Sequence, residues 1–278
     1  MLRAWPLTGG TSAHMTALEI ETPDGANLKL VLRRHGPRDL AHDPHVAAHE
    51  FRLLQILESA GFPAPKPRYL DESETILPTP YLVIDYIDGQ TESAPADPDA
   101  YVQQIATQLA ALHRITPTRA GLSFLPHLRS GFGPPPAHPN DSLHESDIRR
   151  ALNQAWPLPD LNPPVRLHGD FWPGNTLWRE GRIAAVIDWE DARLGTPLAD
   201  VANCRLELLW ALGGEAMAVF TAHYRGLTRA DWTHLAYWDL YAALRPADSL
   251  SGWGLDPVAE QRMRQRHTWF VRQALRKL

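Results

Sequence analysis

The stretch VRLHGDFWPGNTLWREGRIAAVIDWEDARLGTPLAD, residues 165–200, decides how the rest of the chain is interpreted. Its first half contains His168, Asp170 and Asn175 in the spacing H-x-D-x-x-x-x-N. Its second half contains a short apolar run that ends at Asp188. This order of a polar loop, an apolar strand and a further acidic residue is typical of a catalytic loop with a metal-binding group after it.

The residues between Asn175 and Asp188 have the pattern of a β-hairpin. One strand is predicted over residues 176–178 and a second over residues 182–187, with a tight glycine-containing turn at residues 180–181. A hairpin returns the chain to the point where it started. We therefore expect Asn175 and Asp188 to lie side by side, with two oxygen donors facing one point.

Phosphoryl transfer explains these residue types. The reaction needs little covalent help from a protein, but it needs positioning and charge neutralisation. Asp170 can accept the proton of an acceptor hydroxyl, which makes it the candidate general base. Asn175 and Asp188 offer the oxygen ligands that Mg²⁺ prefers. His168 is expected to fix the loop by hydrogen bonding.

Length and composition limit the remaining possibilities. The 278 residues suffice for one large domain or two smaller ones, and 44% hydrophobic with 21% charged residues is ordinary for a globular protein. The net charge of −5 argues against a nucleic-acid partner. The single cysteine, Cys204, excludes an internal disulfide. Because the sequence shows neither a signal-peptide core nor a membrane-spanning apolar run, we expect a cytoplasmic protein without a membrane partner.

The first part of the chain predicts an antiparallel sheet. Residues 16–22 and 28–33 have strand patterns, and Pro-Asp-Gly at residues 23–25 joins them by a turn. A glycine-rich segment precedes the first strand, and its backbone N–H groups could bind phosphates; a simple hairpin turn is the alternative. The candidate nucleotide-binding residues of this segment are Gly9, Gly10, Thr11 and Ser12.

The second strand ends at Arg33, where kinases carry the lysine that pairs with the α- and β-phosphates. Strand alternation favours Arg33 over its neighbour Arg34, because Arg33 points away from the apolar face. A helix is predicted over residues 44–60. Glu50 on this helix is the candidate partner of Arg33, and Glu58 in the last turn is its rival.

Two Asp-Pro pairs predict helix starts. Asp43 would cap the helix that runs to about residue 60, and Asp97 would cap a helix that runs to about residue 113. Another helix is predicted over residues 142–156, and four helices after residue 198. Asp200 lies near the start of the first of these four, where it could bond back to the catalytic loop or cap the helix.

Residues 81–87, YLVIDYI, predict a strongly apolar strand. In a kinase the strand before the connection between the two lobes has this character. The backbone around Asp85, Tyr86 and Ile87 is therefore a candidate for contact with adenine. A buried strand without a ligand is the alternative.

Together these segments resemble the aminoglycoside phosphotransferase and choline kinase-like family of small-molecule kinases. Two motifs are specific and four support them, and their order spans most of the chain. The motifs are HGDFWPGNTLW (168–178), AAVIDWEDARLGTPLAD (184–200), VLRR (31–34), HEFRLLQIL (49–57), YLVIDYIDG (81–89) and LAALH (109–113).

The resemblance implies an α+β, bilobal protein-kinase-like fold, with an N-terminal antiparallel sheet plus one helix and a mainly helical C-terminal lobe. We expect an ATP-binding lobe over residues 1–88 and a catalytic and substrate-binding lobe over residues 89–278. The resemblance also implies ATP and Mg²⁺ as cofactors, Asp170 as the base, and Asn175 and Asp188 as metal ligands.

A protein substrate fits less well than a small molecule with a hydroxyl. Gly169 stands where the catalytic-loop arginine of protein kinases would lie, and the segment from Asp188 to Pro197 leaves no room for a long activation loop. Residues 205–266 contain seven acidic residues and seven arginines, a balance that lowers the case for a polycationic aminoglycoside. The loop is also similar to that of fructosamine kinases, so a sugar adduct, sugar, amino alcohol or other metabolite stays open.

A nucleotide-binding pseudokinase acting as a scaffold is the alternative from another class. It is favoured by Arg33 in place of the family's usual lysine and by the ordinary glycine segment. Against it stand Asp170, Asn175 and Asp188, since a non-catalytic chain has no chemical need for all three. The oligomeric state does not follow from the sequence.

Overall fold

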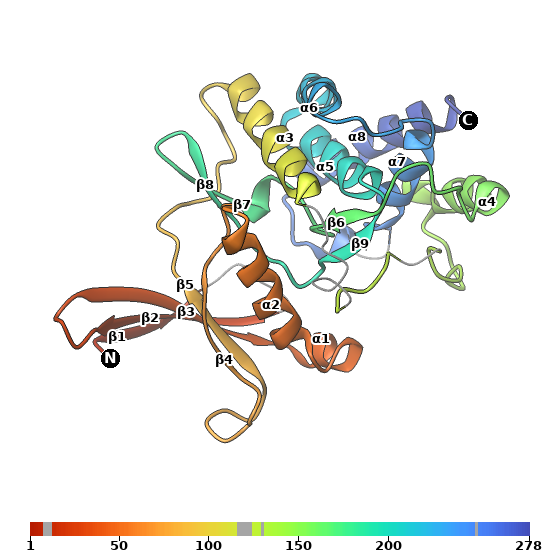
Figure 1. The fold of residues 1–278 in the computed structure, drawn as a ribbon. Helices are drawn as coiled ribbons and strands as arrows, with labels where there is room; N and C mark the ends of the chain where they lie inside the picture. The colour runs from red at the N-terminus through yellow and green to blue at the C-terminus, as the bar shows by residue number, and fades with distance from the viewer. Residues whose placement is uncertain (8–12, 116–123, 129–130, 248–249) are drawn as a thin grey trace. The chain divides into compact units, whose positions relative to one another are not determined.

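The protein is described here by a computed structural model with two compact units (Figure 1). Unit 1 consists of Met1–Thr91 and Thr176–Glu190, and unit 2 consists of Glu92–Asn175 and Asp191–Leu278. The stretch of residues 165–200 therefore contributes residues to both units. The residues that the structure describes are 1–7, 13–115, 124–128, 131–247 and 250–278.

Unit 1 is built on an antiparallel sheet with the strand order β1-β2-β3-β5-β4 (Figure 1). Its strands are β1 (Arg3–Pro6), β2 (Ala13–Glu21), β3 (Asn27–His35), β4 (Pro67–Asp71) and β5 (Tyr81–Asp85). The predicted strands are confirmed, although β5 ends two residues earlier than expected. The hydrogen-bonded register sets Met15 opposite Arg33, in the middle of the sheet.

Two helices follow β3, and only the second was predicted. They are α1 (Pro37–His42) and α2 (Val46–Ser59), and α2 buries Leu53, Leu54 and Leu57. The predicted cap at Asp43 is wrong, because α2 begins after His45. Asp43 instead accepts a hydrogen bond from the backbone N–H of His45 and contacts the ring of His49.

The predicted hairpin is confirmed as β7 (Thr176–Arg179) and β8 (Arg182–Val186). Glu180 and Gly181 both have positive φ angles, as a two-residue turn between twisted strands requires. The hairpin belongs to unit 1 because Trp178 exchanges two backbone hydrogen bonds with Gln90, at 3.0 and 2.8 Å.

Unit 2 is mainly helical, with one small sheet. Its helices are α3 (Pro98–Arg114), α4 (Glu145–Ala155), α5 (Leu198–Leu212), α6 (Gly214–Leu227), α7 (Leu235–Leu244) and α8 (Pro257–Leu275), and its sheet pairs β6 (Val165–Leu167) with β9 (Arg193–Gly195). Short 3₁₀ turns are η1 (Asp141–Leu143), η2 (Pro173–Asn175) and η3 (Leu250–Gly252). The four helices predicted after residue 198 are confirmed, and so is the cap at Asp97, which accepts from the backbone N–H of Ala100.

Helix α5 forms the centre of unit 2 and packs against α6, α7 and α8 (Figure 1). Its buried side chains include Ala202, Leu206 and Leu209, which join the main hydrophobic core. Each buried leucine of this kind contributes about 2 kcal/mol to folding. Helix α5 is therefore anchored in the core of unit 2. Within the described ranges, no helix combines the length and the apolar character needed to cross a bilayer.

Candidate active site

The loop that carries the H-x-D-x-x-x-x-N pattern is held from behind by Asp200 of α5. Asp200 accepts hydrogen bonds from the backbone N–H groups of His168, at 2.7 Å, and Gly169, at 3.0 Å. Burial favours the neutral carboxyl, but the hydrogen bond from His113 and the positive surroundings outweigh it, so the pKa of Asp200 is lowered. His168 accepts from the backbone N–H of Asp170. Of the two alternatives for Asp200, the bond back to the loop is the one that the structure shows, and the expected hydrogen bonding of His168 within the loop is present as well.

His113 extends this support to two further helices. Its Nε2 lies 3.3 Å from the Asp200 carboxylate, and its Nδ1 lies 2.6 Å from the hydroxyl of Tyr224. Helices α3, α5 and α6 are thus connected through one buried polar chain. The sequence motif LAALH ends at this histidine, but its contact with Asp200 could not be deduced from the motif.

Gly169 is required by the shape of the loop. Its φ angle is +86°, a conformation that side chains with a Cβ rarely adopt. A Cβ at this position would also overlap the carbonyl oxygen of Asp191. The glycine that replaces the protein-kinase arginine therefore has a local structural reason.

The carboxylate of Asp170 is oriented from both sides. Its Oδ1 accepts from the guanidinium of Arg245 at 3.1 Å, and its Oδ2 accepts from the side-chain amide of Asn175 at 3.3 Å. Arg245 also donates to the carbonyl of Gly169 at 3.1 Å and to Oδ1 of Asn203 at 2.6 Å. The side chain of Asp170 remains 33% exposed, so a ligand can reach it.

The carboxyl group of Glu207 interacts electrostatically with Asp170. Burial raises the pKa of Glu207 to about 8, the negative charge of Asp170 adds to the rise, and Arg245 opposes it. Glu207 is therefore mainly neutral at pH 7. The guanidinium of Arg245 therefore pairs with Asp170, at 3.1 Å.

In unit 1 the predicted pairing of Arg33 with Glu50 is confirmed. The Nε of Arg33 lies 3.0 Å from Oε2 of Glu50, and both side chains are buried. Its Nη2 donates to Asp188 at 2.8 Å and to Glu190 at 2.5 Å. Burial alone would lower the pKa of Arg33, but these three carboxylates raise it. Arg34 is only partly buried, as strand alternation predicted.

Asp188 follows the hairpin in a left-handed backbone conformation, with a φ angle of 69°. Such a conformation is uncommon outside glycine, and it recurs at functional sites. The side chain is about one third exposed, and burial raises its pKa against the influence of Arg33. Asp188 thus combines a constrained backbone with a carboxylate that a ligand can reach.

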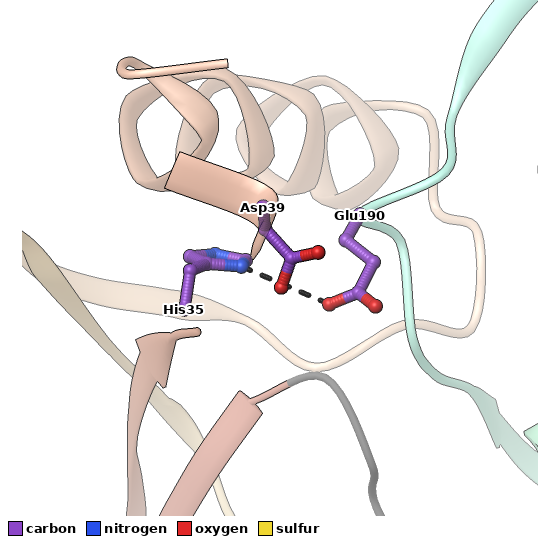
Figure 2. Close-up of side chains that lie close together, drawn as sticks. All are labelled: His35, Asp39 and Glu190. Atoms are coloured by element: carbon purple, nitrogen blue, oxygen red, sulfur yellow. Dashed lines mark ion pairs between the residues drawn. The ribbon is translucent and has the colours of Figure 1, made fainter. Parts of the chain in front are cut away.

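His35 is the main group of this cluster that sequence reasoning missed. Its Nε2 lies 3.0 Å from Oε2 of Glu50, and its Nδ1 lies 3.7 Å from Oε2 of Glu190, beside Asp39 (Figure 2). Burial lowers the pKa of His35, but Glu190 and Glu50 outweigh it and raise the value to about 9. The signal was the alternation of β3, which points His35 to the same side as Arg33.

The structure gives less information on the other residues predicted to contact the nucleotide. The N–H groups of Asp85 and Tyr86 bond to the carbonyls of Lys66 and Lys29, at 2.9 and 3.2 Å. A contact with adenine near Ile87 would therefore use other backbone groups of this segment. Gly9, Gly10, Thr11 and Ser12 lie outside the described residues.

Asn175 and Asp188 fit the chemistry of a magnesium ion. Asn175 uses its amide N–H on Asp170, so its amide oxygen is the atom suited to a metal. Asp188 supplies a carboxylate oxygen. Both are hard oxygen donors of the kind that Mg²⁺ prefers. Asn175 belongs to unit 2 and Asp188 to unit 1, so their joint role stays a prediction.

The sheet with α2 in unit 1 and the helical unit 2 define an α+β protein of the protein-kinase-like class. Residues 6–238 match the model of the phosphotransferase enzyme family, APH, so the chain belongs to this family of phosphate-transferring enzymes.

Solved structures support the fold. An aminoglycoside phosphotransferase, APH(4)-Ia, in complex with AMP-PNP and hygromycin B is similar, with a TM-score of 0.62, 20% identity and coverage of 98% of this chain and 93% of that one. An amicoumacin kinase in complex with AMP-PNP, Ca²⁺ and its ligand has a TM-score of 0.64 at 13% identity, with coverage of 97% and 88%.

Among curated proteins, the chain is similar to acyl-CoA dehydrogenase family member 11 of Rattus norvegicus, with 29% identity over 202 residues. The match covers 65% of this chain and 25% of the relative. The chain thus matches about a quarter of the length of that protein.

Proposed function

We propose that the protein transfers the γ-phosphate of ATP to a hydroxyl group of a small molecule in a Mg²⁺-dependent reaction. The observation that carries this proposal is the orientation of Asp170 by Arg245 and Asn175 in a loop held by Asp200. A general base must be oriented before its substrate arrives, and the hydrogen bonds to Asp170 support this role.

In this reaction Asp170 accepts the proton as the acceptor O–H bond breaks. The acceptor oxygen forms a bond to the γ-phosphorus, and the bond from that phosphorus to ADP breaks. Asn175 and Asp188 would hold Mg²⁺, which neutralises phosphate charge when bound. Arg33 would contribute a permanent positive charge towards the α- and β-phosphates, supported by Glu50.

The proposal that the nucleotide binds to unit 1 rests on Arg33, Glu50 and Asp188, which all belong to that unit. We propose that residues 1–88 supply most of the ATP contacts and residues 89–278 the base and the acceptor contacts. Structures of proteins with a similar fold contain AMP-PNP, which supports a nucleoside triphosphate as the phosphate donor. A single buried cysteine, Cys204, fits the proposal of a cytoplasmic location.

The acceptor is proposed to enter an open recess in unit 2, beside the loop that carries Asp170. The guanidinium groups of Arg193 and Arg245 line this recess with Tyr241 and Asn203. Asp200 also lines it, but its oxygens are used by the loop and by His113. This charge pattern supports a sugar, a sugar adduct or another metabolite over a polycationic aminoglycoside.

The experiment is a coupled assay of ADP release, with sugars, fructosamines, amino alcohols, hydroxy acids and aminoglycosides as separate acceptor pools. The proposal predicts turnover that needs an acceptor and Mg²⁺ and that disappears in Asp170→Asn. Tight ATP binding without turnover in any pool would favour the pseudokinase scaffold instead.

A further inference from the structure

The side chains of His35, Asp39 and Glu190 lie close together in unit 1 (Figure 2). The proposed role of Arg33 in nucleotide binding does not explain this cluster. His35 ends β3, Asp39 lies in α1, and Glu190 follows the hairpin. One nitrogen and two carboxylate oxygens from these residues all lie within 4.8 Å of one another. His35 and Asp39 are only four residues apart, and the segment after the hairpin brings Glu190 to the same point.

Buried polar atoms at this point lack ordinary partners. Oδ2 of Asp39 and Nδ1 of His35 have no hydrogen bond of normal geometry to the residues that the structure describes, whereas Nε2 of His35 has an ion-pair contact with Glu50. The side chain of His35 is fully buried. An unpaired buried polar atom costs free energy, and an ion that completes its bonding is one of the few explanations.

The spacing suits a shared cation. Nδ1 of His35 and Oε2 of Glu190 are 3.7 Å apart, which is too long for a hydrogen bond. Two ligands on one tetrahedral ion lie about 3.4 Å apart when each ligand is about 2.1 Å from the ion. A small movement of the side chains is enough to reach that geometry.

The second ring nitrogen of His35, Nε2, has the kind of partner that metal-bound histidines usually have. Nε2 lies 3.0 Å from the carboxylate of Glu50. A histidine that binds a metal through one nitrogen commonly directs the other N–H to a carboxylate, which fixes the ring and raises its basicity. Glu50 is itself held by Arg33, so the ring orientation is firmly set.

The charge around this point favours a cation. The carboxylates of Glu50, Asp188 and Glu190 share the single guanidinium of Arg33, and Asp39 adds a fourth carboxylate beside His35. Within the described residues, four carboxyl groups thus gather around one guanidinium and one imidazole, which makes this region acidic. A divalent ion would supply positive charge there.

We propose that His35, Asp39 and Glu190 form a binding site for a divalent first-row transition metal ion such as Zn²⁺ or Mn²⁺. Nδ1 of His35 and one oxygen from each carboxylate are the ligands, and water completes the coordination. The imidazole selects against Mg²⁺, which prefers an all-oxygen shell. The site is separate from Asn175 and Asp188 and does not depend on the phosphotransferase proposal.

The ion would join α1, the end of β3 and the segment after the hairpin. It would stabilise unit 1 and fix Glu190 and His35 on either side of Arg33. Its role is therefore structural, and its loss should loosen the environment of the guanidinium without removing a reacting group.

The test is a titration of chelator-treated protein with Co²⁺ in the absence of nucleotide, followed by its visible absorption, with Zn²⁺ as competitor. One equivalent is expected to bind with a spectrum that shows nitrogen ligation. His35→Gln and Asp39→Asn should each weaken binding at least about tenfold. Asp39→Asn changes a partly exposed residue to its isostere, so it tests the site even if His35→Gln fails to fold.

Two control variants identify the site. His49→Gln removes a histidine of unit 1 that contacts Asp43, and it should bind Co²⁺ like the wild type. Asp188→Asn should also retain binding, because Asp188 belongs to the proposed nucleotide-metal site. The proposal is overturned if wild-type protein binds no Co²⁺, if Asp39→Asn binds it with unchanged affinity, or if Asp188→Asn abolishes binding.

Discussion

Replacing Arg33 tests the buried charge cluster and the nucleotide proposal together. Arg33 is 4% exposed and donates to Glu50, Asp188 and Glu190. Removing one partner of a buried ion pair costs about 3–5 kcal/mol, because the remaining charge stays buried. Arg33→Ala should therefore lower the free energy of unfolding by about that amount. Arg34→Ala should change it by no more than about 0.5 kcal/mol, as at most surface positions.

Arg33→Lys separates charge from shape. Lysine keeps the positive charge, but a single ammonium group cannot reach three carboxylates as a planar guanidinium does. We expect the free energy of unfolding of Arg33→Lys to lie between those of the wild type and Arg33→Ala. A double-mutant cycle of Arg33→Ala with Glu50→Gln should give a coupling energy of about 0.5–3 kcal/mol, since the two side chains are in direct contact.

The assay is urea unfolding followed by circular dichroism, with the KM for ATP and kcat measured on the same variants. Arg33→Ala is expected to raise the KM or lower kcat, while Arg34→Ala leaves both unchanged. Equal effects of Arg33→Ala and Arg34→Ala on stability would refute the reasoning about the buried cluster. A damaged cluster with unchanged kinetics would restrict Arg33 to a structural role.

Further predictions concern the loop, the metal and pH. Gly169→Ala should prevent the loop from forming, seen as lost activity and lower stability, whereas the control Gly226→Ala, in α6 with open space around it, should be neutral or stabilise by up to about 1 kcal/mol. Asp188→Ala should weaken ATP binding in titrations with Mg²⁺; equal metal dependence in both proteins would mean that another residue binds the ion. Burial lowers the pKa of His267 to about 4. As the pH falls below about 6.5, this histidine therefore binds a proton in the unfolded chain before it does so in the folded protein. The free energy of unfolding should drop by up to about 3 kcal/mol near pH 4. His267→Gln should flatten that part of the pH–stability curve measured by chemical unfolding, and an unchanged slope would contradict the assignment.

Local patterns predicted most of the fold because the residues that set them are close in sequence. The alternation of β3 correctly turned Arg33 inward, and the Glu180-Gly181 pair correctly marked the hairpin turn. The predicted cap at Asp43 is wrong because its carboxylate bonds to the backbone N–H of His45 and contacts the ring of His49, and α2 begins after His45. Local propensity cannot show which of several nearby donors a carboxylate will choose.

The parts of the site that the sequence could not predict depend on long-range packing. Arg245 reaches Asp170 from the end of α7, and no spacing rule connects the two. His113 meets Asp200 because α3 and α5 both pack against α6. Asp39 is close to His35 in sequence, but Glu190 reaches both residues from the segment after the hairpin, and only the tertiary fold brings it there.

The most direct measurement is single-turnover transfer from γ-³²P-labelled ATP to the acceptor found in the screen, with wild-type protein and Asp170→Asn compared at saturating Mg²⁺. The account predicts that Asp170→Asn binds ATP nearly as well as the wild type but transfers phosphate about 10²–10⁴-fold more slowly, because the base acts on the acceptor hydroxyl and not on the nucleotide. Transfer at the wild-type rate by Asp170→Asn would contradict the central claim.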